Sequence, residues 1–151
     1  MSARLRPYDE KLLRQAFDVA RRAREGGDHP FGSVLADSEG RDRTAHAEKL
    51  LASRAARACD LAFLSRCTLY TSAEPCAMCA GAIYWGGIGR VVYGQTERAL
   101  KAQTGAHEEN PTLDLPCEVV FSAGQRPTEV VGPLLEDEAA ELQADFWTAR
   151  E

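Results

Sequence analysis

The sequence has no long apolar run, and this absence excludes a membrane-spanning helix. No stretch reaches the roughly 20 consecutive apolar residues that such a helix needs. The amino-terminal residues MSARLRPYDEKLLRQ also lack the apolar core of a secretory signal peptide. We therefore expect a cytoplasmic protein without a membrane partner.

An excess of positive charge is also absent. The chain carries 18 Lys and Arg against 23 Asp and Glu, a net charge of −5, and only three of its residues are lysine. Proteins that bind the phosphates of DNA or RNA need a contact face rich in Lys and Arg. The charge balance argues against a nucleic-acid partner and favours a small-molecule one.

The five cysteines do not form a disulfide framework, because their number is odd and no secretion signal precedes them. Cys76 and Cys79 form a C-x-x-C pair, which in a cytoplasmic protein indicates metal or redox chemistry. Cys59, Cys67 and Cys117 lie in or at the start of apolar runs, and we interpret them as buried packing residues.

The length and the hydrophobic periodicity predict a single α/β domain spanning residues 1–151, with helices packed on a sheet. The charged fraction of 27% and the hydrophobic fraction of 44% are ordinary globular values. Helices are predicted over 8–25, 44–58, 75–85, 97–103 and 133–149, the second capped by Thr44. Strands are predicted over 32–37, 67–71, 90–95 and 118–122.

Two short segments carry the residues of a catalytic zinc site. The first, TAHAE, contains His46 and Glu48, and the second, SAEPCAMC, contains Cys76 and Cys79. One imidazole and two thiolates fill three tetrahedral positions of zinc and leave the fourth for water, as catalysis requires. Helix starts favour a neutral imidazole and ionised thiols. Glu48 is placed to move protons between water and substrate.

Two other interpretations of these residues stay open. A thioredoxin-like redox pair also uses C-x-x-C, but here Pro75 precedes the pair and no Trp flanks it. A closed structural zinc site would need a fourth protein ligand, and neither His29 nor His107 has suitable spacing. Neither alternative has a use for Glu48.

The chain resembles the cytidine/deoxycytidylate deaminase-like superfamily. The resemblance rests on the H-x-E and P-C-x-x-C combination and on the segments HPFGSV, LYTSAEPCAMCAGAIYW and GRVVYG. It implies a three-layer α-β-α sandwich with a mixed, roughly five-stranded sheet, a bound Zn²⁺, hydrolytic removal of an exocyclic amine, and a homodimer. The stretch GAIYW resembles guanine deaminases, which implies a free purine-type base, guanine-like, as substrate.

The same resemblance implies a set of substrate contacts. Phe31 would lie against the substrate ring, the backbone N–H of Ala47 would contact a ring atom, and Trp85 would line the base pocket. Glu108 and Glu109 are the candidates for an acidic loop residue that binds the base. Glu74, just before Pro75, is expected to hold the loop structurally.

One segment departs from the pattern of the superfamily. The resemblance implies a β-hairpin before the HAE helix and an Asn after its second strand, yet GSVLADSEG is followed almost directly by RDRTAHAE. Either an edge strand is lost, or residues of the natural protein are missing from this sequence after Gly40. We favour missing residues, because losing the strand would expose a ladder edge and remove a substrate contact.

Three alternative functions are left open by the sequence. A tRNA adenosine deaminase shares PCxMC but needs an RNA-binding face, whereas the terminal segment LLEDEAAELQADFWTARE is mostly acidic. A cytosine-type base or a nucleoside could also be the substrate. From another class, the chain could be a non-catalytic zinc or redox module.

Overall fold

The computed structural model describes residues 4–27, 31, 46–105 and 107–147. Within them the helices are α1 (Asp9–Glu25), α2 (Ala47–Ala58), α3 (Leu61–Leu64), α4 (Ala77–Gly86), α5 (Glu97–Thr104), α6 (Cys117–Ser122) and α7 (Glu136–Glu141). The strands are β1 (Thr68–Ala73), β2 (Arg90–Gln95) and β3 (Glu129–Val131). The predicted α/β class is confirmed. No helix in this part of the chain is long and apolar enough to cross a membrane.

The sheet has the strand order β1-β2-β3, and both pairings are parallel. Leu69 lies opposite Val91, and Val92 lies opposite Val131. The expectation of a mixed sheet of about five strands is not met by the described residues, which supply three parallel strands. The predicted strand over 32–37 and the proposed cap Thr44 lie outside the described residues.

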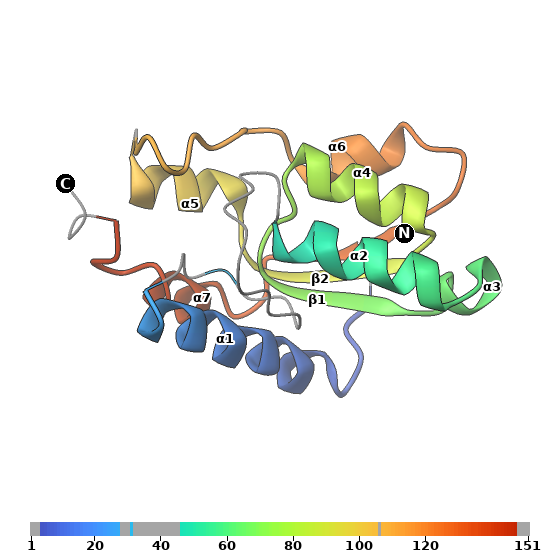
Figure 1. Cartoon of the computed structure of the whole chain (residues 1–151), viewed down its shortest axis with the longest axis horizontal. Coiled ribbons are helices and arrows are strands. Elements are labelled where there is room, and N and C mark those ends of the chain that lie inside the picture. Colours follow the sequence, from blue (N-terminus) through green and yellow to red (C-terminus); the bar gives the residue numbers. More distant parts are fainter. Residues whose placement is uncertain (1–3, 28–30, 32–45, 106, 148–151) are drawn as a thin grey trace.

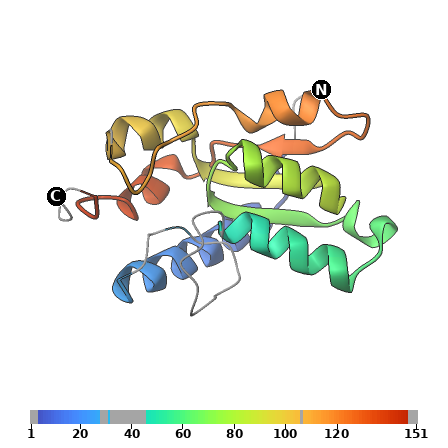
Figure 2. The ribbon, with the colours of Figure 1, turned by 45° about the horizontal axis from the view of Figure 1, so that its top comes forward.

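Helices cover both faces of this sheet. Helices α2 and α4 pack against each other on one face, with α6 against α4, while α1 and α7 pack on the opposite face (Figures 1 and 2). Every residue of β2 is buried, as expected for a central parallel strand covered on both sides. Val91 belongs to the core on the α2–α4 side, and its neighbour Val92 to the core beside α1. The three-layer arrangement therefore holds.

The predicted strand over 118–122 is wrong, because this segment is helix α6. The run EVVF has β-branched residues typical of a strand, but its burial repeats with helical spacing. Cys117 and Phe121, four residues apart, are buried, whereas Glu118 and Val119 between them are exposed. The third strand of the sheet is instead β3, which the pattern analysis missed.

The predicted terminal helix over 133–149 is mostly wrong, because only Glu136–Glu141 forms α7. Leu135 precedes it in the left-handed region with φ 54°, and Asp145 follows with φ 59°. Non-glycine residues in this region interrupt a right-handed helix. The apolar spacing of the segment is explained by burial of Leu142, Phe146 and Trp147 in turns after the helix.

Candidate metal centre and active site

The three candidate ligands meet where α2 and α4 begin. Strand β1 ends at Ala73, and three residues later the chain reaches Cys76, the N-cap residue of α4, with Cys79 in the first turn. His46 is the N-cap residue of α2, which lies beside α4. In open parallel α/β folds, the region outside the carboxyl ends of the strands is where ligands bind. The local structure thus carries all three side chains to that edge.

The distances within this group suit a zinc ion. The ligand atoms of His46, Cys76 and Cys79 all lie within 4.8 Å of one another, and Cys76 Sγ is 3.6 Å from His46 Nδ1. Tetrahedral zinc with Zn–S near 2.3 Å and Zn–N near 2.1 Å requires an S···N separation of about 3.6 Å. Cys79 is buried, Cys76 is half-buried and His46 is exposed, so one side of the group is open to solvent.

The electrostatics of the three donor groups also suit the binding of a cation. The pKa of Cys76 is lowered to about 4, because the Cys79 thiol and the His46 ring donate hydrogen bonds to its sulfur. The pKa of Cys79 is raised, since that hydrogen bond uses its proton and the thiol is buried. The pKa of His46 is raised by its hydrogen bond to Cys76. Protons held in this way are the ones that a metal cation displaces.

Glu48 lies beside the ligand group and is buried. Its Oε1 accepts a hydrogen bond of 3.1 Å from the Thr71 hydroxyl, and its Oε2 lies 3.7 Å from Cys79 Sγ. Burial raises the pKa of this carboxyl group. A buried carboxyl with a raised pKa is suited to general acid–base catalysis. The structure thus brings Glu48 to the place that its predicted role requires.

Glu74 ties the ligand loop to two helices, which confirms its predicted structural role. One carboxylate oxygen accepts a hydrogen bond of 3.0 Å from the Glu97 backbone N–H, at the start of α5. The other accepts a hydrogen bond of 2.9 Å from the Cys117 backbone N–H, at the start of α6. The side chain is 6% exposed. Because Glu74 stands two residues before Cys76, this bridge fixes the loop that carries the first thiol.

The structure does not bring all of the expected substrate residues to the ligands. Ala47 begins α2, next to His46, and Phe31 is half-buried with its ring 6.0 Å from that of Trp147. Trp85 lies near the far end of α4, about 9 Å along the helix from Cys79, and is 81% exposed. Glu108 and Glu109 are exposed in the loop after α5. Both cysteine ligands lie at the start of α4, so Trp85 near the end of this helix lies away from the ligand group.

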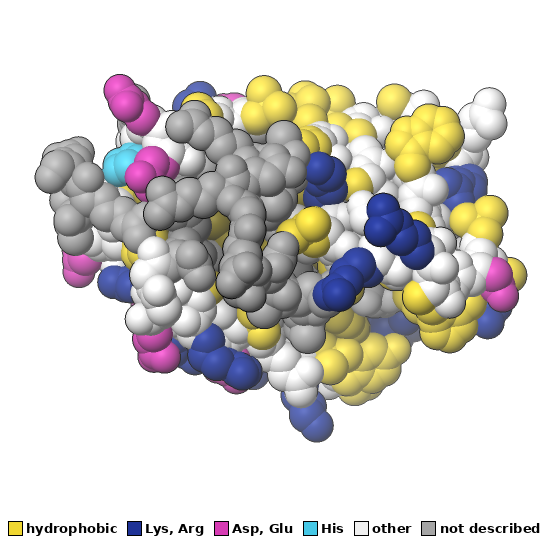
Figure 3. Space-filling view, in the orientation of Figure 1, with side chains coloured by type: hydrophobic (Ala, Val, Ile, Leu, Met, Phe, Trp, Pro, Cys, Tyr) yellow, Lys and Arg dark blue, Asp and Glu magenta, His cyan; other side chains and the backbone are white. Residues whose placement is uncertain are grey.

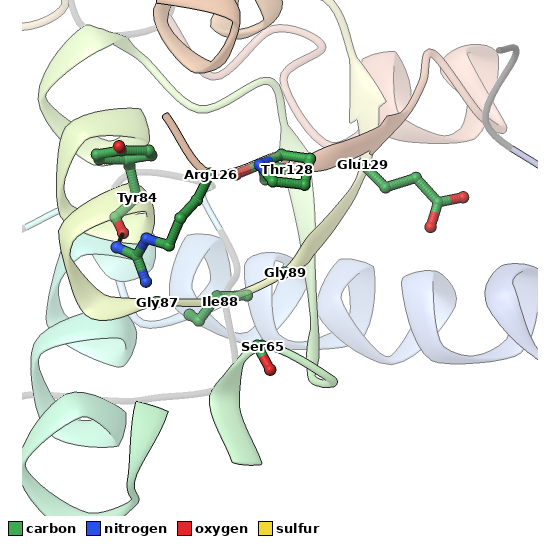
Figure 4. A pocket seen from close by; sticks show the side chains of 9 residues that line it. Ser65, Tyr84, Gly87, Ile88, Gly89, Arg126, Thr128 and Glu129 are labelled. Atoms are coloured by element: carbon green, nitrogen blue, oxygen red, sulfur yellow. Dashed lines mark hydrogen bonds between the residues drawn. The ribbon is translucent and has the colours of Figure 1, made fainter. Parts of the chain in front are cut away.

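A separate hollow of about 340 Å³ lies at this far end of α4 (Figure 4). The Arg126 guanidinium group stacks over the Tyr84 ring at 5.1 Å and donates a hydrogen bond to the Tyr84 carbonyl oxygen. Arg126 thereby caps the last turn of α4. None of the candidate zinc ligands lines this hollow, so it is distinct from the candidate active site.

Glu97 is the acidic residue near the site that the sequence analysis missed. It is the first residue of α5, directly after β2 and Thr96, and is 7% exposed. Burial and the nearby charges of Cys76 and Glu48 raise its pKa to about 7. Its position in the sequence could have indicated it, because Glu97 follows the carboxyl end of a parallel strand that lies next to β1.

Comparison with known families decides the affiliation of this domain. Residues 6–95 match the family described as "Cytidine and deoxycytidylate deaminase zinc-binding region". The chain belongs to this deaminase family. The resemblance noted in the sequence is confirmed, and the His46–Cys76–Cys79 group could hold the metal of this zinc-binding region. A member of this family is a hydrolytic deaminase acting on C–N bonds.

The relatives of this deaminase differ in their described substrates. A probable cytosine deaminase of Schizosaccharomyces pombe is 38% identical, over 97% of this chain and 96% of its own. A tRNA-specific adenosine deaminase of Bacillus subtilis is 31% identical, over 92% of this chain and 88% of its own. Among solved structures, a variant of the protein NE0047 in complex with 8-azaguanine is 25% identical, with a TM-score of 0.71. That match covers 98% of this chain and 97% of that chain.

Proposed function

We propose that this deaminase removes the exocyclic amine of a free nucleobase, with a guanine-like purine as the preferred substrate. The observation that carries the proposal is the convergence of His46, Cys76 and Cys79 within 4.8 Å, with the buried carboxyl of Glu48 beside them. This set is the one that hydrolytic nucleobase deamination needs. Neither a structural zinc site nor a redox pair has a use for Glu48, which argues against a non-catalytic module.

The proposed reaction consumes water and releases ammonia. His46, Cys76 and Cys79 would hold the zinc ion, which would supply a nucleophile at neutral pH by lowering the pKa of a water molecule. Glu48 would take one proton from that water to the ring nitrogen beside the reacting carbon, and would then pass the remaining hydroxyl proton to the amine. The water oxygen bonds to the amine-bearing ring carbon, the C–N bond breaks, and the amine leaves as ammonia. Thr71 holds Glu48 through one oxygen, which leaves the other directed at the ligand group.

A free base is favoured by two of the relatives taken together. The complex of NE0047 with 8-azaguanine supports a purine ring, and the relative from S. pombe supports cytosine as the second candidate. Both are small planar rings without phosphate. Phe31 is proposed to stack on the ring, and the backbone N–H of Ala47 is proposed to bind a ring atom. Glu108 and Glu109, exposed in the loop after α5, remain the proposed candidates for an acidic contact to the base.

A tRNA substrate is the main competing proposal, because of the B. subtilis relative. The net charge of −5 opposes binding of a polyanion, and contacts to phosphate weaken steeply with salt. We expect ammonia from guanine or cytosine and no inosine in a tRNA that carries adenosine in its anticodon loop, at low and moderate salt. Inosine formation without ammonia from any free base would refute the free-base proposal.

The metal assignment is tested separately by elemental analysis of the purified protein. We expect about one zinc per chain, and a large loss of zinc in Cys79→Ala. Full retention of zinc in that variant, or none in the wild type, would contradict the ligand set. A single-domain organisation and a cytoplasmic location remain predictions of the sequence.

We also propose a homodimer, supported by exposed apolar side chains on one side of the molecule. Leu61, Phe63, Trp85 and Val119 are all about half exposed or more, and they come from α3, α4 and α6. Figure 3 shows several groups of hydrophobic side chains on this side, with Lys and Arg side chains between them. Exposed apolar groups that lie near one another are typical of protein–protein contacts.

A further inference from the structure

The carboxyl group of Glu48 is tied to strand β1 by a hydrogen bond. The Thr71 hydroxyl donates to Glu48 Oε1 at 3.1 Å, although the two residues are 23 positions apart in the chain. Thr71 is 1% exposed, so this bond is shielded from solvent. The second carboxyl oxygen, Oε2, lies 3.7 Å from Cys79 Sγ. One oxygen of Glu48 is therefore fixed to the sheet, while the other faces the candidate ligand group.

The residue type at position 71 is not explained by packing alone. Leu69, two residues earlier in β1, belongs to the apolar core on the α2–α4 side, and side chains two residues apart in a strand share a face. Valine has nearly the shape of threonine, is favoured in strands, and has no polar group to bury. The hydroxyl of Thr71 is thus explained by what it binds rather than by the core around it.

Binding of a metal ion would leave Glu48 more dependent on Thr71. While Cys79 keeps its proton, its thiol donates to Glu48 Oε2. Cysteine binds a metal as the thiolate, so Cys79 in its ligand form has no proton to donate. Its negative charge then repels the neighbouring carboxylate. Of these two contacts, only the hydrogen bond from Thr71 would still hold the carboxyl group in place.

We propose that Thr71 is a positioning residue that keeps Glu48 Oε2 directed at the ligand group throughout the reaction. This inference rests on the proposed function and adds to it a residue that acts through Glu48. A donor on Oε1 leaves Oε2 as the oxygen that takes up and releases the proton. The carboxyl group then needs no rotation between the two proton transfers, and its geometry is set before the base arrives.

The first test compares Thr71→Val with Thr71→Ser in the zinc-loaded full chain, with Thr68→Val as the matched control. Thr68 lies in the same strand, but an odd spacing places its side chain on the opposite face. In Thr71→Val, kcat for guanine or cytosine should fall about tenfold to a hundredfold, as expected for a hydrogen bond to a charged group, with KM changed less than about threefold. Thr71→Ser and Thr68→Val should both stay within about threefold of the wild-type kcat.

A packing role for Thr71 predicts the opposite order of the two variants. Thr71→Ser removes a buried methyl group, whereas Thr71→Val keeps the shape of the side chain, so packing would make the serine variant worse in turnover and in Tm. That order, or wild-type kcat in Thr71→Val, would overturn the proposal. In the Glu48→Ala protein, adding Thr71→Val should reduce the residual turnover by less than about twofold, and a further tenfold loss would show that Thr71 acts independently of Glu48.

Crystal structures of the zinc-loaded wild type and of Thr71→Val separate this inference from the proposed reaction. We expect Glu48 in one conformer in the wild type, bonded to Thr71, and displaced or split between conformers in Thr71→Val. An unmoved Glu48 in the variant overturns the proposal. Absence of ammonia release by the wild type would refute the proposed reaction, while the position of Glu48 still decides the role of Thr71.

Discussion

Removing the Glu74 carboxylate should destabilise the protein more than almost any other single change near the site. Both oxygens are used, at 3.0 Å by the Glu97 N–H and at 2.9 Å by the Cys117 N–H. A hydrogen bond to a charged group contributes about 1.5–3 kcal/mol, and here both donors would be left buried. Glu74→Ala should therefore lower the free energy of unfolding by about 3–6 kcal/mol. That is a large part of the roughly 5–15 kcal/mol of a typical domain.

Urea unfolding of the zinc-loaded protein measures this effect. Glu74→Gln should lose about half as much, because its amide oxygen keeps one acceptor while its NH₂ group faces a second donor. Glu118→Ala, an exposed glutamate at the start of α6, is the control and should change stability by less than about 0.5 kcal/mol. A loss below 1 kcal/mol in Glu74→Ala would refute the argument that this carboxylate holds the ligand loop.

Three further predictions concern other parts of the chain. Burial opposes ionisation of Asp9, but hydrogen bonds led by that from Arg90 still lower its pKa to about 2. The free energy of unfolding of the wild type should therefore lose about 2 kcal/mol relative to that of Asp9→Asn as the pH falls from about 4 to 2. Urea unfolding of both proteins at each pH measures this difference. The same pH dependence of stability in both proteins would refute the prediction. Trp85→Ser should weaken self-association in sedimentation while base turnover stays within about twofold; lost turnover in an intact dimer would place Trp85 in the pocket. The natural protein should exceed 16.5 kDa by more than about a kilodalton in intact-mass spectrometry, because of residues missing after Gly40; a matching mass would indicate a lost edge strand.

The candidate zinc ligands could be predicted from the sequence because their geometry is mostly local. Cys76 and Cys79 share one helix start, and His46 and Glu48 share another, so only the pairing of two helices had to be assumed. The structural role of Glu74 was also predictable, because this residue lies in the short loop just before Pro75 and the helix that carries both cysteines. Spacing along the chain fixes such side chains before any tertiary contact forms.

Features that depend on distant contacts could not be predicted in this way. The run EVVF has strand propensity, and it becomes α6 because Glu74 binds the Cys117 N–H and Phe121 joins the core. Trp85 was assigned from resemblance, yet the direction of α4 carries it away from the ligands. Glu97 looked like an ordinary helix start, and only the order of the strands shows that it follows the strand next to β1.

The most direct test of the central claim is ammonia release from guanine, with cytosine in parallel, by the zinc-loaded protein and by its Glu48→Ala variant. We predict steady release by the wild type. The variant should keep its zinc and its fold but be slower by about 10²–10⁴-fold, the usual contribution of a general acid–base group. A variant within tenfold of the wild type would show that another residue moves the protons. No ammonia from either base with zinc bound would contradict the proposal that this protein deaminates a free nucleobase.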